Sequence, residues 1–588
     1  MDSQSERKLR ELRLNLAEIC LEGRLERLSA LCCNPSGDAI ATMINSGVRH
    51  LALAKHEQAV AERCHRVLSV EYDVTRKVGA YLGLSLFSFP QSIERAFDIV
   101  DVPTPLLGTV TKVLLSLPIF FTRDGMRRRA LAHLEATTQE IHKAASVIDE
   151  PDFRQALLGG FIEGFTITSV YGEDVSLRGL AQHRAGLIRM YLDSHGLARD
   201  VEPMPRSPQD TTVRLGVLCP GAGSETAATR GHLLGLDRSV FNIVALVPDE
   251  AASGISAAFA DVADDFLALP VADIARCAEI IAAENFDILL AGANLTNSCR
   301  FPWTLLMAQR LARLQVAMHS CPLTTGFPTI DAFINGELNE PEDAQDDYSE
   351  ELLLVPGSSN HYAFIGAPPA PTAITREQLG VPDSALLLAS GTNYFKIGPE
   401  LIDAWARIMA TTPDSHLVLY PFNPNWTTHY PFRDGFLRFI QSRFAEHDVA
   451  VERLHVIEAQ RDRGPIHAIL KLADLYLDSF PYSGAVSLTD PIAMGCPVVV
   501  REGHTARCRQ SAAMLQELGL EVLVTQSTDD YVTLASRLLQ DHGLRREMAE
   551  AMADIGGQSR MVSGSAIGHH VGDALLKALK RKLNIAVI

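Results

Sequence analysis

The sequence predicts an α/β protein in which an all-α block precedes two doubly wound units, each with its own parallel sheet. Residues 1–205 carry apolar side chains at helical spacing and show little strand character. Short apolar strands then alternate with helices through residues 206–372, and a second series of the same kind occupies residues 373–588. Such alternation is typical of right-handed β-α-β units, whose parallel sheets are covered on both faces.

The all-α block begins with leucines at near-helical spacing from Leu9 to Leu31, and Ala/Leu-rich segments continue to Leu192. No repeat of the tetratricopeptide kind recurs along it. Its end is marked by three prolines, Pro203, Pro205 and Pro208. The most apolar stretch, residues 102–121, is interrupted by prolines and Lys112, so we predict a buried helix pair there and no membrane span.

The first α/β unit opens with a strand at 213–219 that ends at the Gly-rich turn 220–224. Further strands are predicted at 241–247, 286–290 and 316–319. Helices are predicted from the turn to Leu236, at 274–284 with Asp273 as N-cap, and at 303–314.

The second α/β unit follows a Pro-rich junction at 367–371. Strands are predicted at 386–390, 417–420, 454–457, 475–478, 497–500 and 522–524, with helices between them, notably 400–410 and 466–472. Two such units in sequence would form a cleft between them. Because ligands of open α/β sheets bind beyond the carboxyl ends of the strands, we expect the functional site in that cleft.

Composition limits the classes of protein that this chain can be. With 588 residues, 47% hydrophobic and 21% charged, the chain can bury sizeable cores, which excludes a disordered protein. The formal charge is −18, from 53 Lys and Arg against 71 Asp and Glu. This balance argues against nucleic acid as a partner, because neutralising many phosphates needs clustered basic side chains. A nucleotide pocket needs only one or two cations, so it is compatible with this net negative charge.

The spacing of the cysteines and the N-terminal residues indicate the cellular compartment of the protein. The ten cysteines form no paired C-x-x-C arrangement and no zinc-site spacing, so we expect reduced thiols and no metal. The first residues run into a charged helical pattern without the apolar core of a secretory signal. These features predict a cytoplasmic protein.

Lys396 follows the first strand of the second unit, within the segment Gly391–Pro399. An ammonium at the carboxyl edge of the sheet could neutralise a leaving diphosphate. The alternative is an ordinary loop lysine.

A strand ending at Asp478 leads through Gly484 to a helix predicted to start near Ser487. The N–H groups and dipole of a helix start can hold a diphosphate. Ser487 and Asp490 also fit a capping box, in which the serine caps the helix and the acid three residues later caps the serine. The two interpretations are compatible with each other.

Histidines near strand ends or helix starts are the next candidates. His232 follows the Gly-rich turn of the first unit, and His467 opens the helix before Asp474, which favours both over His319 and His429. Any single histidine is more often structural than catalytic. The acidic pair Asp346-Asp347 lies in an acidic run and is predicted to be a solvated loop.

Several segments together resemble the family 41 glycosyltransferases, which include O-linked N-acetylglucosamine transferases and bacterial cytoplasmic N-glycosyltransferases that modify adhesins. The resemblance covers roughly residues 210–545. It is carried by Phe395–Pro399, Leu401–Trp405, Leu475–Tyr482, Asp490, Met494–Pro497, Asp346–Leu352 and Pro322–Gly326. It implies a GT-B fold of two Rossmann-like domains. It also implies inverting, metal-independent transfer of a sugar from a UDP-sugar to a protein side chain. The UDP-sugar would be a substrate and not a cofactor.

The same resemblance assigns residues. It places Lys396 at the donor diphosphate, Asp490 at the ribose and Ser487 at the phosphate-binding helix start. The expected donor side comprises Asn393, Lys396, His467, Gly484, Ser487 and Asp490. Thr324 and Thr325 are expected in the acceptor cleft. His232 and Lys396 are the expected catalytic residues, with His232 as the candidate base. Ala485, Val486 and Cys321 depart from the family pattern.

The all-α block resembles the shorter N-terminal domain of the bacterial N-glycosyltransferases, which favours a hexose donor and asparagine acceptors in a protein such as an adhesin. By fold-level analogy its helices would pack against the first Rossmann-like domain and shape the acceptor groove. The alternatives are an O-linked N-acetylglucosaminyltransferase, a non-catalytic nucleotide-sugar-binding scaffold, suggested by the departures, and a GT-B-like nucleotide-sugar epimerase.

Overall fold

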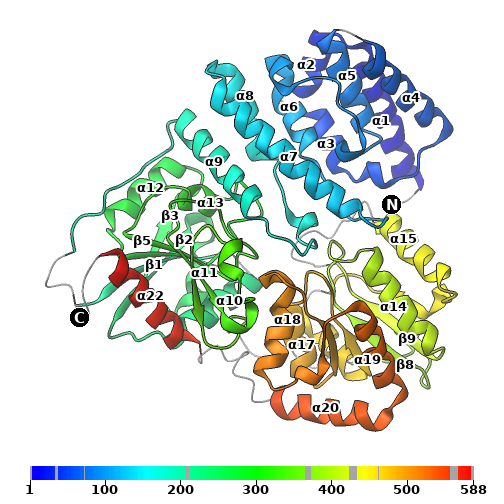
Figure 1. Ribbon diagram of the computed structural model, residues 1–588, viewed down its shortest axis with the longest axis vertical. Coiled ribbons are helices and arrows are strands. Elements are labelled where there is room, and N and C mark those ends of the chain that lie inside the picture. The colour runs from blue at the N-terminus through cyan, green and yellow to red at the C-terminus, as the bar shows by residue number, and fades with distance from the viewer. Residues whose placement is uncertain are drawn as a thin grey trace.

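The computed structural model contains the three predicted bodies (Figure 1). In this view the helical block, coloured blue to cyan, lies above two α/β units that stand side by side. The predicted fold class is therefore confirmed. The structure describes residues 3–33, 37–71, 73–206, 211–221, 223–364, 373–422, 433–460, 462–556 and 567–583.

The helical block packs its apolar stripes into one core that also reaches the first α/β unit. Its α-helices are α1 (Ser3–Glu22), α2 (Leu25–Cys32), α3 (Ala39–Asn45), α4 (Lys55–Val70), α5 (Val74–Ser85), α6 (Thr104–Leu114), α7 (Met126–Val147), α8 (Pro151–Gly164) and α9 (Arg178–Ser194). A fully buried ion pair between Arg13 and Glu57 joins α1 to α4.

The apolar stretch 102–121 contains one helix, α6, and not the predicted pair. After the C-cap at Leu115 the chain is irregular. Pro118 explains this, because proline lacks an N–H group and disfavours helical backbone in the residue before it. Among the described residues, no helix is both long and apolar enough to cross a membrane.

The first unit is built on a seven-stranded parallel sheet with the spatial order β3-β2-β1-β4-β5-β6-β7. Its strands are β1 (Val213–Leu218), β2 (Phe241–Pro248), β3 (Asp265–Leu269), β4 (Ile288–Ala291), β5 (Leu314–Met318), β6 (Ala332–Gly336) and β7 (Glu351–Val355). Its helices are α10 (Ser224–Leu233), α11 (Ala252–Phe259), α12 (Ile274–Ala283) and α13 (Pro302–Met307).

Sequence patterns predicted β1, β2, β4 and β5 but missed β3, β6 and β7. β3 is partly exposed along most of its length, and β6 ends in Asn335 and Gly336, residue types that strands disfavour. Asp273 caps α12 as predicted, because its side chain accepts a hydrogen bond from Arg276 N at 3.0 Å. The helix predicted at 303–314 is shorter, since α13 ends at Met307.

The second unit contains a six-stranded parallel sheet with the spatial order β10-β9-β8-β11-β12-β13. Its strands are β8 (Leu386–Ser390), β9 (Ser415–Leu419), β10 (Leu454–Val456), β11 (Leu475–Leu477), β12 (Val498–Arg501) and β13 (Val524–Thr525). Its helices are α14 (Pro399–Thr411), α15 (Arg433–Glu446), α16 (Arg463–Leu472), α17 (Val486–Ala493), α18 (Ala506–Glu517), α19 (Thr528–Gln540) and α20 (His542–Gly556). Every strand predicted here is present, within a shift of one or two residues.

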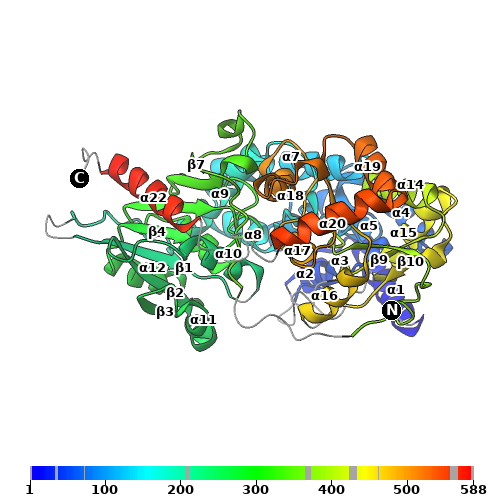
Figure 2. The same ribbon diagram turned by 90° about the horizontal axis from the view of Figure 1, so that it is seen from below.

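The last helix, α22 (Gly568–Lys582), returns to the first unit, as Figures 1 and 2 both show. Its apolar residues join the core of the first sheet. A Cβ atom on Gly568 would lie 1.8 Å from Leu234 O, so only glycine permits this approach. Lys582 Nζ also donates to Asp331 at 2.8 Å. The predicted second domain, 373–588, therefore includes a segment that packs on the first sheet; the junction 367–371 and Pro208 lie outside the described residues.

Candidate functional site

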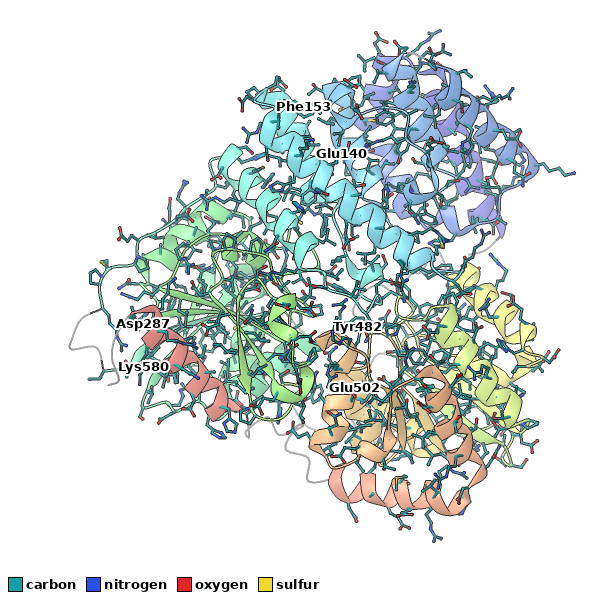
Figure 3. The ribbon with its side chains drawn as sticks, viewed as in Figure 1. Glu140, Phe153, Asp287, Tyr482, Glu502 and Lys580 are labelled. Carbon is teal, nitrogen blue, oxygen red and sulfur yellow. The ribbon has the colours of Figure 1, made fainter. Side chains whose placement is uncertain are left out.

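The carboxyl ends of β8 and β11 lie next to each other, because the two strands pair in parallel with Leu475 opposite Leu388. The loop after β8 carries Asn393 and Lys396, and the loop after β11 leads into α17. Two segments singled out in the sequence therefore meet at one edge of the second sheet. Figure 3 shows Tyr482, from the second of these loops, near the place where the three units meet.

Lys396 is held against the loop that follows β11. Its ammonium donates to Ser483 O at 2.6 Å and lies 3.9 Å from the centre of the Tyr482 ring. Burial lowers the pKa of Lys396 to about 8, although the Asp478 carboxylate opposes that shift. A cation fixed in this way can meet an anionic ligand with little reorganisation.

Asn393 lies at the start of the same turn, where its carbonyl oxygen accepts a hydrogen bond from Lys396 N at 2.9 Å. Its side-chain oxygen is buried and has no partner within the part of the chain that the structure describes. Buried polar atoms are normally paired, so this acceptor is available to a ligand donor such as a hydroxyl group. The position of Asn393 thus fits its predicted place on the donor side.

The lowered pKa of Lys396 leads to a prediction about pH. If the protonated amine binds the diphosphate of UDP, affinity for UDP should be nearly constant up to pH 7.5. Above the pKa of about 8 it should fall, approaching tenfold per pH unit, because binding must then also take up a proton. Calorimetric titration at several pH values measures this. In Lys396→Arg the cation keeps its charge, so the fall should disappear; an equal fall in this variant would contradict the assignment.

Ser487 and Asp490 do not form the predicted capping box. α17 begins at Val486 with Ala485 as N-cap, and no side chain caps it, so Ser487 is already inside the first turn. The Asp490 carboxylate instead accepts hydrogen bonds from two side chains of α16, Arg463 Nε at 2.7 Å and His467 Nε2 at 2.6 Å. No side chain caps the backbone N–H groups at the start of α17. These groups can therefore still bind an anion such as a diphosphate.

Gly484 permits the tight packing of the loop before α17. Its N–H donates to the buried Asp478 carboxylate at 3.0 Å, and a Cβ atom would lie 2.4 Å from Asp478 Oδ1. Burial raises the pKa of Asp478, while the Gly484 N–H and Lys396 oppose that rise. The loop therefore has one compact shape, which fixes the position of the groups around Lys396.

His232, the predicted base, lies within α10 and is 1% exposed. Its Nδ1 atom is 2.8 Å from Ala228 O of its own helix, and its ring stacks on His319 at 4.4 Å. Burial lowers the pKa of His232 to about 4 and that of His319 well below its ordinary value, so both are neutral near pH 7. These contacts give His232 a structural setting that does not favour proton transfer from a protein acceptor.

Thr324 and Thr325, predicted in the acceptor cleft, are buried at 1% and 0% exposure. Thr324 Oγ1 donates to Glu350 Oε2 at 2.5 Å, and Thr325 N donates to Glu350 Oε1 at 2.9 Å. Both residues therefore hold the segment before β7 in place, and their hydroxyl groups are occupied.

The helical block contributes to this region in a way that sequence patterns did not reveal. Arg127 of α7 donates to Phe395 O at 3.3 Å, so it braces the Lys396 loop. Asp174 accepts hydrogen bonds from His504 N at 2.7 Å and Thr505 N at 2.8 Å, just before α18. The Arg127–Phe395 and Asp174–His504 contacts join residues that are 268 and 330 positions apart in the sequence. No local sequence pattern could therefore indicate them. The block also packs against the first unit, as predicted, where Arg184 Nη2 donates to Leu295 O at 2.6 Å.

A cavity of about 570 Å³ opens at the carboxyl edge of the first sheet. It is lined by Glu225, Asn294, Asn297, Ser298, Arg300, Phe301 and Pro302. Glu225 stands in the first turn of α10, and Asn294 follows β4. Neither residue was singled out from the sequence, because a glutamate in a first helical turn is the usual complement of the helix dipole.

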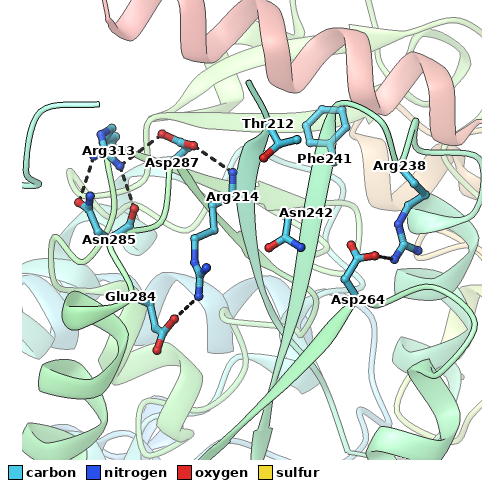
Figure 4. Close-up of a pocket in the computed structure, with 10 residues that line it drawn as sticks. All are labelled: Thr212, Arg214, Arg238, Phe241, Asn242, Asp264, Glu284, Asn285, Asp287 and Arg313. Carbon is cyan, nitrogen blue, oxygen red and sulfur yellow. Dashed lines mark hydrogen bonds and ion pairs between the residues drawn. The ribbon is translucent and has the colours of Figure 1, made fainter. Parts of the chain in front are cut away.

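A second polar cavity, of about 390 Å³, lies at the opposite, amino edge of the first sheet (Figure 4). Its three arginines each pair with an acid, namely Arg214 with Glu284, Arg238 with Asp264 and Arg313 with Asp287. These pairs balance the charge of its walls, and the edge is the one away from ligand sites in open α/β sheets.

No group of histidine, cysteine, aspartate and glutamate suited to a metal ion occurs in the described ranges. All ten cysteines are free thiols, of which Cys33 alone is exposed. Burial raises the pKa of Cys321 to about 12, so it is a neutral thiol.

Comparison with known proteins links this geometry to a family. Residues 360–564 match the family model described as Glycosyl transferase family 41, and this range contains Lys396, Gly484 and Asp490. The resemblance inferred from the sequence is thereby confirmed over the second unit.

Several of the similar curated proteins come from plants. A probable UDP-N-acetylglucosamine–peptide N-acetylglucosaminyltransferase SPINDLY of Oryza sativa subsp. japonica is 28% identical over 297 residues, which cover 50% of this chain and 30% of that protein. The protein of the same description from Solanum lycopersicum is 30% identical over 254 residues, 42% of this chain and 26% of that protein. The chain thus spans less than a third of the length of these relatives.

A solved structure supports the fold over nearly the whole chain. The O-GlcNAc transferase of Thermobaculum terrenum, in a mutant form, matches with a TM-score of 0.59 and 19% identity, covering 93% of this chain and 98% of that chain. The match includes the helical block as well as both α/β units, and the overall architecture is of the GT-B type.

Proposed function

We propose that this chain is a protein glycosyltransferase that transfers a sugar from a UDP-sugar to a protein side chain, with inversion and without a metal. The observation that supports it most is the hydrogen bond from Lys396 to the loop that leads into α17, inside the segment that matches family 41. The UDP-sugar is a substrate in this reaction, and no other cofactor is invoked.

Each group at this edge has a role in the proposal. Lys396 and the N–H groups at the start of α17 balance the charge that develops on the leaving UDP. Fixed dipoles and one cation suit an acidic protein, because no broad basic surface is needed. Asn393 offers its unpaired oxygen to a donor hydroxyl, and Asp490, oriented by Arg463 and His467, binds the ribose.

We favour asparagine side chains and a hexose donor, since the helical block lacks tetratricopeptide-type repeats and resembles that of bacterial cytoplasmic N-glycosyltransferases. An adhesin or another surface protein is the corresponding acceptor. A second candidate, N-acetylglucosamine transfer to serine or threonine, is supported by the names of the plant relatives.

Mass spectrometry distinguishes these possibilities. We expect the purified chain, incubated with several UDP-sugars and a library of acceptor peptides, to add one sugar to a peptide, and fragmentation to locate it on asparagine. Location on serine or threonine, with UDP-N-acetylglucosamine as the preferred donor, would support the second candidate. Binding of UDP without transfer to any peptide would indicate a non-catalytic scaffold and contradict the proposal.

A further inference from the structure

We propose that Glu225, and not His232, takes the proton from the acceptor side chain during transfer. The inference rests on the proposed function. As the acceptor lone pair forms a bond to the anomeric carbon, the bond from that carbon to the UDP oxygen breaks and its electron pair leaves with UDP. The O–H or N–H bond of the acceptor breaks in the same process, and its proton passes to the Glu225 carboxylate and later to water.

The position of Glu225 follows from the topology of the first sheet. β1 and β4 pair in parallel, with Leu218 opposite Ala291, so the segments that follow them meet at the carboxyl edge. Glu225 comes from the first of these segments, and Asn294 N from the second donates to Glu225 Oε2 at 3.3 Å. Among the described residues no other group donates to this carboxylate, and it faces the cavity of about 570 Å³. A free carboxylate oxygen at the wall of an open cavity can accept a proton from a ligand.

A continuous set of contacts joins Glu225 to the donor edge. Lys396 Nζ lies over the Tyr482 ring, and that ring packs edge-on against Tyr171 at 5.8 Å. Tyr171 Oη is 3.0 Å from Thr296 Oγ1, and Thr296 N donates to Asn294 Oδ1 at 2.9 Å. Burial raises the pKa of Tyr482 to about 12, and the Glu225 charge is among the groups that contribute. These contacts link the wall of the cavity to the groups that would hold the donor.

The surroundings of Glu225 also suit a base. Burial raises its pKa, and the Asn294 N–H group opposes that rise only in part. A carboxylate with a raised pKa is a stronger proton acceptor near neutral pH. The other charged and titratable groups near this region are not suited to act as the base. Cys321 is a neutral thiol, and Arg184 of α9 donates to a backbone carbonyl. Arg300 lines the cavity and is exposed, and the Glu350 carboxylate accepts hydrogen bonds from Thr324 and Thr325.

His232 provides the contrast. Its ring is buried between its own helix and His319, and a Cβ on the adjacent Gly231 would lie 2.4 Å from His361 O, so the helix is packed tightly there. At 1% exposure, the ring cannot be reached by a protein acceptor unless the side chains around it rearrange.

The test is the pH profile of transfer, followed by mass spectrometry with saturating UDP-sugar, in Glu225→Gln, Glu225→Asp and His232→Gln. We expect Glu225→Gln to lower kcat by about 10²–10⁴-fold and to remove the acid limb of the profile. Glu225→Asp keeps a carboxylate and should retain the acid limb at an intermediate rate. Affinity for UDP should change less than about twofold in both, because Glu225 does not bind the diphosphate.

His232→Gln serves as the matched control and should keep the acid limb, with thermal unfolding confirming that each variant is folded. An unchanged kcat and acid limb in Glu225→Gln, or loss of the limb in His232→Gln alone, would overturn the role of Glu225. Failure of the proposed function looks different, because the wild-type chain would then transfer no sugar to any peptide, and the role of Glu225 would fall with it.

Discussion

Replacing Lys396 with alanine is expected to lower kcat for sugar transfer by about 10²–10³-fold, the effect of removing one preorganised group that stabilises developing negative charge. The ammonium is fixed by Ser483 O at 2.6 Å and by the Tyr482 ring at 3.9 Å, and the segment 391–399 has no second basic side chain to replace it. Transfer rates measured by peptide mass spectrometry at saturating donor give kcat directly.

Two variants make this result specific. Lys396→Arg keeps the charge but not the shape of the ammonium and should recover only part of the rate. Lys471→Ala removes an exposed lysine of α16 in the same unit and should leave the rate unchanged. If Lys396→Ala transferred sugar as fast as the Lys471 variant, the donor role of Lys396 would be wrong.

The largest expected effect on stability is at Glu57. Its carboxylate is fully buried and accepts hydrogen bonds from Arg13, from Arg10 Nη1 at 2.7 Å and from Ala54 N at 2.8 Å. Glu57→Gln leaves the buried Arg13 without a negatively charged partner, which should destabilise the fold by about 3–5 kcal/mol. Denaturant unfolding of the whole chain, followed by circular dichroism, measures the change in the free energy of unfolding.

A surface pair provides the control. Glu11 pairs with Arg7 at 2.9 Å on the exposed face of α1, and Glu11→Gln should cost only about 0–1 kcal/mol. Equal effects of the two substitutions would show that the buried pair contributes no more than the exposed one.

The same site predicts how stability depends on pH. Burial alone would raise the pKa of Glu57, but the Ala54 N–H group and Arg13 outweigh it and hold the pKa below its ordinary value. A carboxyl group with a lowered folded-state pKa stabilises the fold above its unfolded pKa of about 4.3, and the contribution is lost as the pH falls through the folded value. The wild-type chain should therefore lose stability below about pH 4 more steeply than Glu57→Gln.

The elements that position the donor edge could be predicted from the sequence because their signals are local. β8 and β11 are apolar runs that end in polar loops, and α14 and α16 have clear apolar faces. Fold class and the place of Lys396 follow from those patterns alone. β3 and β7 were missed although each is a short apolar run after an acidic residue; in the fold their side chains are partly exposed.

The contacts within the site depend on tertiary structure. The sequence pattern gave a wrong prediction where the same residue spacing fits both a helix cap and a contact with another helix. Ser487 and Asp490 have the spacing of a capping box, but Asp490 is drawn to Arg463 and His467 of a neighbouring helix. His232 was favoured by its place after a Gly-rich turn, although the helical turn that contains it faces inward. Glu225 looks like an ordinary first-turn acid until the fold brings Asn294 and Tyr482 near it.

UDP binding to the whole chain is the most direct test of the account, because it needs no knowledge of the acceptor. Calorimetric titration at pH 7 should show one UDP bound per chain, at least about tenfold weaker in Lys396→Ala, since one charge-assisted contact contributes about 1.5–3 kcal/mol. The Lys471→Ala variant should bind as the wild type does. UDP affinity unaffected by the loss of Lys396, or no UDP binding at all, would contradict the claim that this sheet edge holds the nucleotide diphosphate.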